Sequence, residues 1–170
     1  RLEQLAGRTF EDVLALLWDA AGHSGVRVRA AALRASTLAL LRDAAARRVA
    51  PMDALRMAAG TLTAEDDAEA AHLLVGSFPT IVAAYARLLR GEEPLAPRES
   101  LGLAANYLYM SSGSEPHAEL VRGLETYLST VADHGFNAST FTARVIVSTG
   151  SDFVSAVTGA IGALKRPLHG

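Results

Sequence analysis

The sequence predicts an all-α protein, and three observations point to this fold class. Thirty-three of the 170 residues are alanine, the strongest helix former, whereas the chain has only 5 Phe, 4 Tyr and 1 Trp. Apolar residues recur at helical spacing along nearly the whole chain. The best strand candidate, at residues 145–147, is too short to displace that pattern. The length suits one domain or part of one.

Helix-start and helix-stop residues divide the first half of the chain. Thr9 precedes two acidic residues, which is an N-cap signature, and Gly22 ends the helix that follows. Pro51 favours a helix start because its missing N–H is not needed in a first turn. Thr63 is the expected N-cap of a further helix. The predicted segments are a short turn at 2–5, helices at 9–22, 51–60, 63–75 and 77–91, and one long or two short helices at 26–48.

The second half begins with an acidic, proline-bearing surface loop at residues 91–97. Ser151 and Asp152 are expected to cap the last helix. A break at residues 133–137 separates two helices and leaves short polar side chains at the junction. The predicted helices cover 99–110, 117–132, 139–149 and 152–164.

Composition excludes several classes of function. The 16 basic and 18 acidic residues give a net charge of −2, so no electrostatic footprint for nucleic acid or an anionic membrane is expected. The absence of cysteine excludes disulfides, Cys-ligated metals and thiol catalysis from this chain, and it fits a cytoplasmic location. No apolar run approaches the roughly 20 residues that cross a bilayer. Because the chain starts at Arg1 and stops at Gly170 on a turn signal, we expect a piece of a longer protein.

Five histidines are the main ionisable candidates near neutral pH. His23 and His117 are expected on the solvated surface, and His72 is expected to be a partly buried structural residue. His134 and His169 differ because each follows a predicted helix end closely.

The segment from Asp133 to Thr140 could hold an anionic substrate, since a helix N-terminus offers free N–H groups and positive potential. From the residues alone, a functional pair of His134 and His169 and two merely structural histidines both remain open. A metal site is less favoured because 35 residues separate the pair and no third ligand is obvious.

The last predicted helix is unusually rich in small residues. Glycine in a helix interior costs about 1 kcal/mol, so a close backbone approach is the expected compensation. Packing within the same chain and packing against a copy in a second subunit are both open. The small residues are Ser155, Ala156, Gly159, Ala160, Gly162 and Ala163.

Several segments resemble the citrate synthase family. The most specific runs from Asp133 to Arg144, and its continuation covers residues 151–165 and the Pro-Leu-His-Gly sequence at 167–170. Upstream segments similar to the bacterial branch lie at 51–56, 78–85 and 90–94. The resemblance covers essentially the whole chain in the right order. Citrate and 2-methylcitrate synthases share these motifs.

The resemblance implies a multi-helical citrate synthase-like large domain and a homodimer. Residues 1–170 correspond to a single partial domain, the N-terminal portion of that large domain, with the small domain and the C-terminal part absent. The implied reaction condenses acetyl-CoA with oxaloacetate to citrate and CoA, the entry to the tricarboxylic acid cycle. Acetyl-CoA is then a co-substrate, and no tightly bound cofactor is implied.

The resemblance also implies roles for four residues. His134 hydrogen-bonds and orients oxaloacetate. Asn137 supports the turn that carries His134, and it is expected to bind substrate together with His134. His169 donates to the thioester oxygen as the enol forms, and Ser139 positions His169. An imidazole N–H aimed at an oxygen that gains negative charge stabilises that charge, which fits the implied chemistry.

The chain departs from the family pattern in two respects. The family's catalytic aspartate, third histidine and carboxylate-binding arginines all lie after the His169 motif, so this chain holds roughly half of the active site. Arg166 stands where the family usually has glycine. The alternatives are therefore a non-catalytic truncated citrate synthase-like subunit and a 2-methylcitrate synthase, and we expect no turnover from residues 1–170 alone.

Overall fold

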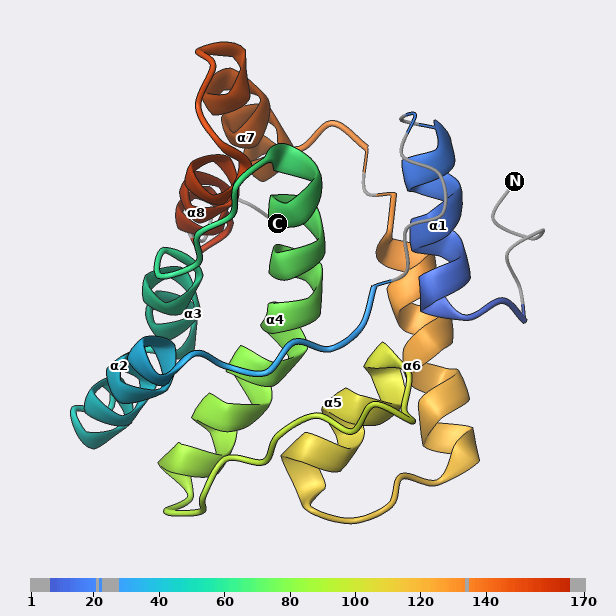
Figure 1. Cartoon of the computed structure of the whole chain (residues 1–170), viewed down its shortest axis with the longest axis vertical. Helices are drawn as coiled ribbons and strands as arrows, with labels where there is room; N and C mark the ends of the chain where they lie inside the picture. Colours follow the sequence, from blue (N-terminus) through green and yellow to red (C-terminus); the bar gives the residue numbers. More distant parts are fainter. Residues whose placement is uncertain (1–6, 21, 23–27, 134, 166–170) are drawn as a thin grey trace.

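The computed structural model describes residues 7–20, 22, 28–133 and 135–165, which form eight α-helices and no strand (Figure 1). The predicted all-α class is therefore confirmed. The helices are α1 (Phe10–Ala20), α2 (Ala35–Ala46), α3 (Pro51–Ala59), α4 (Asp67–Leu89), α5 (Leu103–Ser112), α6 (Ala118–Val131), α7 (Ala138–Ser148) and α8 (Phe153–Leu164).

Helix α4 runs through the middle of the molecule and separates two groups of helices (Figure 1). On one side it contacts α2, α3 and α8, and α7 packs along α8. On the other side it contacts α5, and α6 packs against α5 and α1. The two segments of strongest family resemblance thus form neighbouring helices, α7 and α8, at one end of the molecule.

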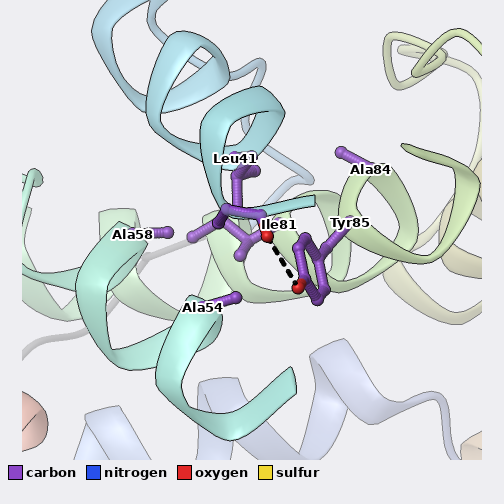
Figure 2. Close-up of a cluster of buried hydrophobic side chains, with 7 residues drawn as sticks. Leu41, Ala54, Ala58, Ile81, Ala84 and Tyr85 are labelled. Atoms are coloured by element: carbon purple, nitrogen blue, oxygen red, sulfur yellow. Dashed lines mark hydrogen bonds between the residues drawn. The ribbon is translucent and has the colours of Figure 1, made fainter. Parts of the chain in front are cut away.

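A core of small and medium side chains joins α2, α3 and α4 (Figure 2). Alanines let the three helices approach closely, and Tyr85 of α4 supplies the large aromatic surface among them. The Tyr85 hydroxyl donates to the carbonyl of Val49. The carbonyl oxygen of Ala44 lies 3.5 Å from the same hydroxyl (Figure 2). Its polar end is thereby satisfied inside the core. The buried members are Leu41, Ala44, Ala54, Ala58, Ile81, Ala84 and Tyr85.

A second cluster fixes α1 to the rest of the molecule. Leu14, Val28 and Leu103 are buried together, and the first and last of them belong to α1 and α5. Trp18 of α1 meets His72 of α4 edge to face, with ring centroids 4.8 Å apart. The partly buried structural role expected for His72 is confirmed.

Helix α4 is one continuous helix, whereas the sequence predicted two. The expected N-cap Thr63 lies outside it, and Asp66 caps it instead by accepting a 2.8 Å hydrogen bond from the backbone N–H of Glu69. Pro79 lies inside the helix, not at a helix start. Tertiary contacts offset the hydrogen bond that proline removes, because α4 packs against helices on both sides.

Residues 28–34 are extended, so the helix expected over 26–48 begins only at Ala35. The N–H of Ala31 donates to the carbonyl of Gly76 at 2.8 Å. A Cβ on Gly76 would lie 2.3 Å from the carbonyl oxygen of Arg29. The contact with α4 therefore overrides the helical preference of an Ala- and Arg-rich segment.

Local side-chain hydrogen bonds account for the starts of two other helices, α1 and α5. At α1 the backbone N–H of Asp12 donates to the Thr9 hydroxyl, and the N–H of Thr9 donates to the Asp12 carboxylate, as predicted. Helix α5 starts at Leu103, four residues later than expected. The buried Asn106 side chain donates to the carbonyls of Arg98 and Leu101, which holds residues 98–101 in a loop.

Within the described residues, α4 is the one helix long and apolar enough to cross a bilayer, with a mean hydropathy of 1.3. This apolar stretch is longer than the sequence predicted, because the helices predicted at 63–75 and 77–91 form one continuous helix. However, 44% of that stretch is buried within the protein, and Figure 1 shows α4 between the two helix groups. A core helix has these same properties.

Candidate active site

Of the four residues to which the family resemblance assigns a role, two are described by the structure and two are not. His134 and His169 lie outside the described residues, so their predicted convergence stays a prediction. Asn137 and Ser139 are described, and they lie where α7 begins. The local geometry around each histidine must therefore come from its neighbours in the chain.

The turn before α7 is held by side chains on both sides of residue 134. The Asp133 carboxylate accepts a 3.0 Å hydrogen bond from the N–H of Gly135, whose φ of +64° favours glycine. Asn137 is the N-cap of α7, and its Oδ1 accepts from the N–H of Thr140 at 2.9 Å and from the Ser139 hydroxyl at 2.8 Å. These bonds connect the turn to the positive end of α7, which suits an anionic ligand.

Asn137 caps α7, whereas its support of the turn that carries His134 stays a prediction. Its side-chain oxygen serves the helix start, and its direct contact with substrate stays a prediction. The positioning of His169 by Ser139 is likewise untested, because His169 is not described.

An exposed aromatic pair flanks the turn. Phe136 is 68% exposed and meets Phe141 of α7 edge to face, with 5.7 Å between ring centroids. The guanidinium of Arg144 lies 5.3 Å from the Phe136 ring centre. Phe141 and Val145 lie four residues apart on α7 and are both exposed, so this helix presents an apolar strip to its surroundings.

The small residues of α8 serve packing within this chain at Gly159. A Cβ there would lie 2.4 Å from Cδ1 of Ile146 on α7. Ala156 and Ile161 are buried as well. Of the two alternatives for this helix, close packing inside the same chain is therefore shown for Gly159, and packing against a second subunit is not needed to explain it.

The end of α8 is fastened to the start of α3. Lys165 is the C-cap of α8, and its ammonium donates to Oδ1 of Asp53 at 2.7 Å. A guanidinium nitrogen of Arg56 lies 3.8 Å from the same Oδ1. The hydrogen bond from Lys165, together with the charges of both cations, lowers the pKa of Asp53.

Beside these charged groups lies a pocket of about 410 Å³, lined by α3 and α8. Thr158 contributes a buried hydroxyl oxygen that has no protein hydrogen-bond partner. Gly159 and Gly162 line the pocket on the α8 side. The pocket adjoins the point where the chain continues toward His169.

Sequence reasoning missed the contact between Asp53 and Lys165. The two residues are 112 positions apart, and each has a sufficient local explanation, an acid in a first turn and a base at a helix end. Only the packing of α3 against α8 brings them together. Of the remaining histidines, His117 is exposed as predicted, and His23 lies outside the described residues. No group of three or more metal-binding side chains occurs in the described part of the chain.

Comparison with known proteins gives a consistent result. The family model described as "Citrate synthase, C-terminal domain" matches residues 1–170. A 2-methylcitrate synthase of Mycobacterium tuberculosis is 52% identical over 110 residues, which are 62% of this chain and 28% of that protein. Citrate synthase 2 of Bacillus subtilis is 52% identical over 97 residues, which are 57% of this chain and 26% of that protein.

Solved structures agree over a longer stretch. The citrate synthase of Pyrobaculum aerophilum matches all of this chain at a TM-score of 0.87 and 36% identity, and the match covers 49% of that protein. The citrate synthase of Thermoplasma acidophilum, solved as a ternary complex with carboxymethyl coenzyme A and oxaloacetate, matches 81% of this chain at a TM-score of 0.67 and 27% identity, covering 38% of that protein. The present chain thus spans about half the length of the P. aerophilum enzyme.

Proposed function

The chain belongs to the citrate synthase family, and from this premise we propose that the whole protein condenses acetyl-CoA with oxaloacetate to give citrate and free CoA. The observation that carries the proposal is the family match over residues 1–170. Relatives that are 52% identical over the aligned residues are named 2-methylcitrate synthase and citrate synthase. The hydrogen bonds that Asp133 and Asn137 accept on either side of residue 134 support it, because they lie close to the positive terminus of α7.

The reaction requires a C–H bond to break beside a thioester. A base takes a proton from the acetyl methyl group, and the electron pair moves toward the thioester oxygen. We assign His169 as the hydrogen-bond donor to that oxygen, because an aligned N–H stabilises the charge that develops there. The family resemblance puts the base downstream of His169, beyond the residues of this chain.

The second half of the reaction forms a carbon–carbon bond. The enol carbon attacks the ketone carbon of oxaloacetate, and water then cleaves the citryl thioester and releases CoA. We assign His134 to hydrogen-bond the ketone oxygen, which makes its carbon more electrophilic. Asn137 supports this step by fixing the turn through its cap of α7.

A second acyl donor is favoured by one observation. The M. tuberculosis 2-methylcitrate synthase and the B. subtilis citrate synthase 2 are equally identical to this chain, at 52%. Condensation of propionyl-CoA is therefore the alternative reaction for the same histidines. The ratio of kcat/KM for acetyl-CoA to that for propionyl-CoA decides between the two.

Free CoA release by the full-length protein tests the proposal. The wild type is expected to release CoA when given oxaloacetate with either acetyl-CoA or propionyl-CoA. Replacing His169 by Ala removes one donor to the oxyanion and is expected to lower kcat about 10²- to 10³-fold, with a comparable loss for His134→Ala. His117→Ala, at an exposed histidine, is the matched control and is expected to retain full activity.

Absence of CoA release with any 2-oxo acid and either thioester would contradict the enzyme proposal. That result would favour the non-catalytic, truncated citrate synthase-like subunit. The substitution of Arg166 for the family's usual glycine motivates this alternative. The length of the open reading frame is a second discriminator, because a stop codon soon after Gly170 would leave no room for a base.

We propose further that the protein is a homodimer that uses the outer face of α7. Phe141 and Val145 are 54% and 47% exposed on this helix, and Leu164 at the end of neighbouring α8 is 48% exposed. Such apolar side chains are commonly covered at subunit interfaces. Light scattering of the full-length protein is expected to give a dimer mass, and a Phe141→Glu/Val145→Glu variant is expected to shift it toward the monomer.

Two further expectations belong to the proposal. Residues 1–170 form the N-terminal portion of the family's large domain, and the protein acts in the cytoplasm. Cell fractionation checks the location. Limited proteolysis of the full-length protein, with the fragments identified by mass spectrometry, checks the domain boundary.

A further inference from the structure

We propose that Asp53 is a positioning residue for His169, acting through Lys165. This inference rests on the proposed function, in which His169 takes part in the condensation. It assigns a role in that reaction to a residue far from His169 in the sequence. The contact that carries it is the 2.7 Å hydrogen bond from the Lys165 ammonium to the Asp53 carboxylate.

Asp53 is held firmly on its own side of this contact. It lies in the first turn of α3, just after Pro51, which restricts the backbone there. In the same helix, Ala54 and Ala58 belong to the buried cluster that joins α3 to α2 and α4 (Figure 2). The carboxylate therefore projects from a rigid part of the fold.

Lys165, unlike Asp53, lies at the end of a helix. It ends α8, and three residues separate it from His169 along the chain. A helix end without tertiary contacts frays easily, and movement there would pass directly into the segment that carries the imidazole. Binding of the lysine to α3 fixes the point from which that segment departs.

Two further contacts make the site more than a single surface ion pair. Arg56 reaches the Asp53 carboxylate at 3.8 Å. A Cβ on Gly162 would come within 3.9 Å of the Arg56 side chain, so this arginine lies against the last turns of α8. The Asp53 side chain is only 24% exposed, which limits the screening of its charge by water. We refer to this group as the α3–α8 clamp; it consists of Asp53, Arg56 and Lys165.

The kinetic consequence follows from the position of the clamp. If it sets the placement of His169, its loss moves a donor relative to the oxygen on which charge develops. A displacement of about 1 Å in such a group costs up to about a hundredfold in rate, whereas binding of oxaloacetate through the residue 134 turn is unaffected. Loss of the clamp therefore lowers kcat and leaves the KM for oxaloacetate unchanged.

The test uses the full-length protein and removes the clamp from either side. The variants Asp53→Asn and Lys165→Met each break it, and the double variant Asp53→Lys/Lys165→Asp restores it with exchanged charges. Glu93→Gln is the matched control, because it breaks an exposed bidentate ion pair with Arg42 on α2. The measurements are kcat, KM, melting temperature and hydrogen exchange of the peptide covering residues 164–170.

Both single variants are expected to lose about ten- to a hundredfold in kcat, with faster amide exchange confined to residues 164–170. The variant with exchanged charges is expected to recover part of the lost kcat and part of the lost protection from exchange. Recovery is incomplete because a cation in the first turn of α3 is unfavourable. Glu93→Gln is expected to match the wild type. Wild-type kcat and wild-type exchange in the two single variants would overturn the inference. If the wild type itself shows no turnover, the proposed function fails and hydrogen exchange alone decides whether the clamp holds this segment.

Discussion

Replacing Gly76 by alanine tests whether the extended segment 28–34 really lies against α4. The new Cβ would lie 2.3 Å from the backbone carbonyl oxygen of Arg29, which no side-chain rotation can relieve. The segment would have to move away, and the 2.8 Å hydrogen bond from the N–H of Ala31 to the Gly76 carbonyl would weaken or break. An isolated helix would instead gain stability from the same substitution.

The magnitude follows from three contributions. Overpacking of this kind costs about 1–3 kcal/mol, and the lost hydrogen bond costs about 1 kcal/mol more. The higher helix propensity of alanine returns about 1 kcal/mol. We therefore expect Gly76→Ala to lower the free energy of unfolding by about 1–3 kcal/mol.

Scanning calorimetry of the full-length protein measures this effect. Gly123→Ala is the matched control, because Gly123 lies inside α6 and no atom of a neighbouring element lies within 4 Å of the place that a Cβ would take. There the substitution is expected to raise stability by up to about 1 kcal/mol. A Gly76→Ala protein that melts as high as Gly123→Ala would refute the packing of residues 28–34 against α4.

Three further predictions concern the core, a helix cap and a partly buried acid. Tyr85→Phe removes the hydroxyl that donates to the Val49 carbonyl and is expected to cost about 1–2 kcal/mol in urea denaturation. Asp152→Ala removes the N-cap of α8 and is expected to lower the melting temperature at pH 7. Hydrogen bonding to Ser155 lowers the pKa of Asp152. The stability that the charged Asp152 cap contributes is therefore complete above about pH 4 and is lost as the pH falls through the lowered pKa. The difference in melting temperature between wild type and variant should shrink over the same pH range. Burial raises the pKa of Glu125, so its charged form costs stability at neutral pH, and Glu125→Gln is expected to be more stable by up to about 0.5 kcal/mol at pH 7 but not below about pH 4.

Local signals predicted the helices well where a cap lies beside its helix. The pairs Thr9 with Asp12 and Asp152 with Ser155 make the hydrogen bonds that their spacing suggests. Signals of this kind act over three residues, so they are visible in the sequence without knowledge of the fold. The break before α7 was predicted for the same reason.

Long-range contacts explain the failures. Pro79 is a strong local reason to divide α4, yet packing on both sides keeps the helix continuous. The alanines between Ala30 and Ala35 favour a helix, yet the approach to Gly76 keeps most of them extended. The clamp between Asp53 and Lys165 depends on two helices meeting, and no spacing rule connects them.

The site divides in the same way. The break between α6 and α7 was evident from short polar residues between two helical patterns, and the structure shows Asn137 capping α7 there. The roles of His134 and His169 came from family resemblance, because nothing in the spacing of two residues 35 positions apart shows that they meet.

A crystal structure of the full-length protein with oxaloacetate and a non-reactive acetyl-CoA analogue tests the central claim most directly. The account predicts that His134 and His169 enter one cleft, with His134 within hydrogen-bond distance of the ketone oxygen and His169 within hydrogen-bond distance of the thioester oxygen or its substitute. Imidazole rings in separate places, or either ring enclosed in apolar packing away from both ligands, would contradict it.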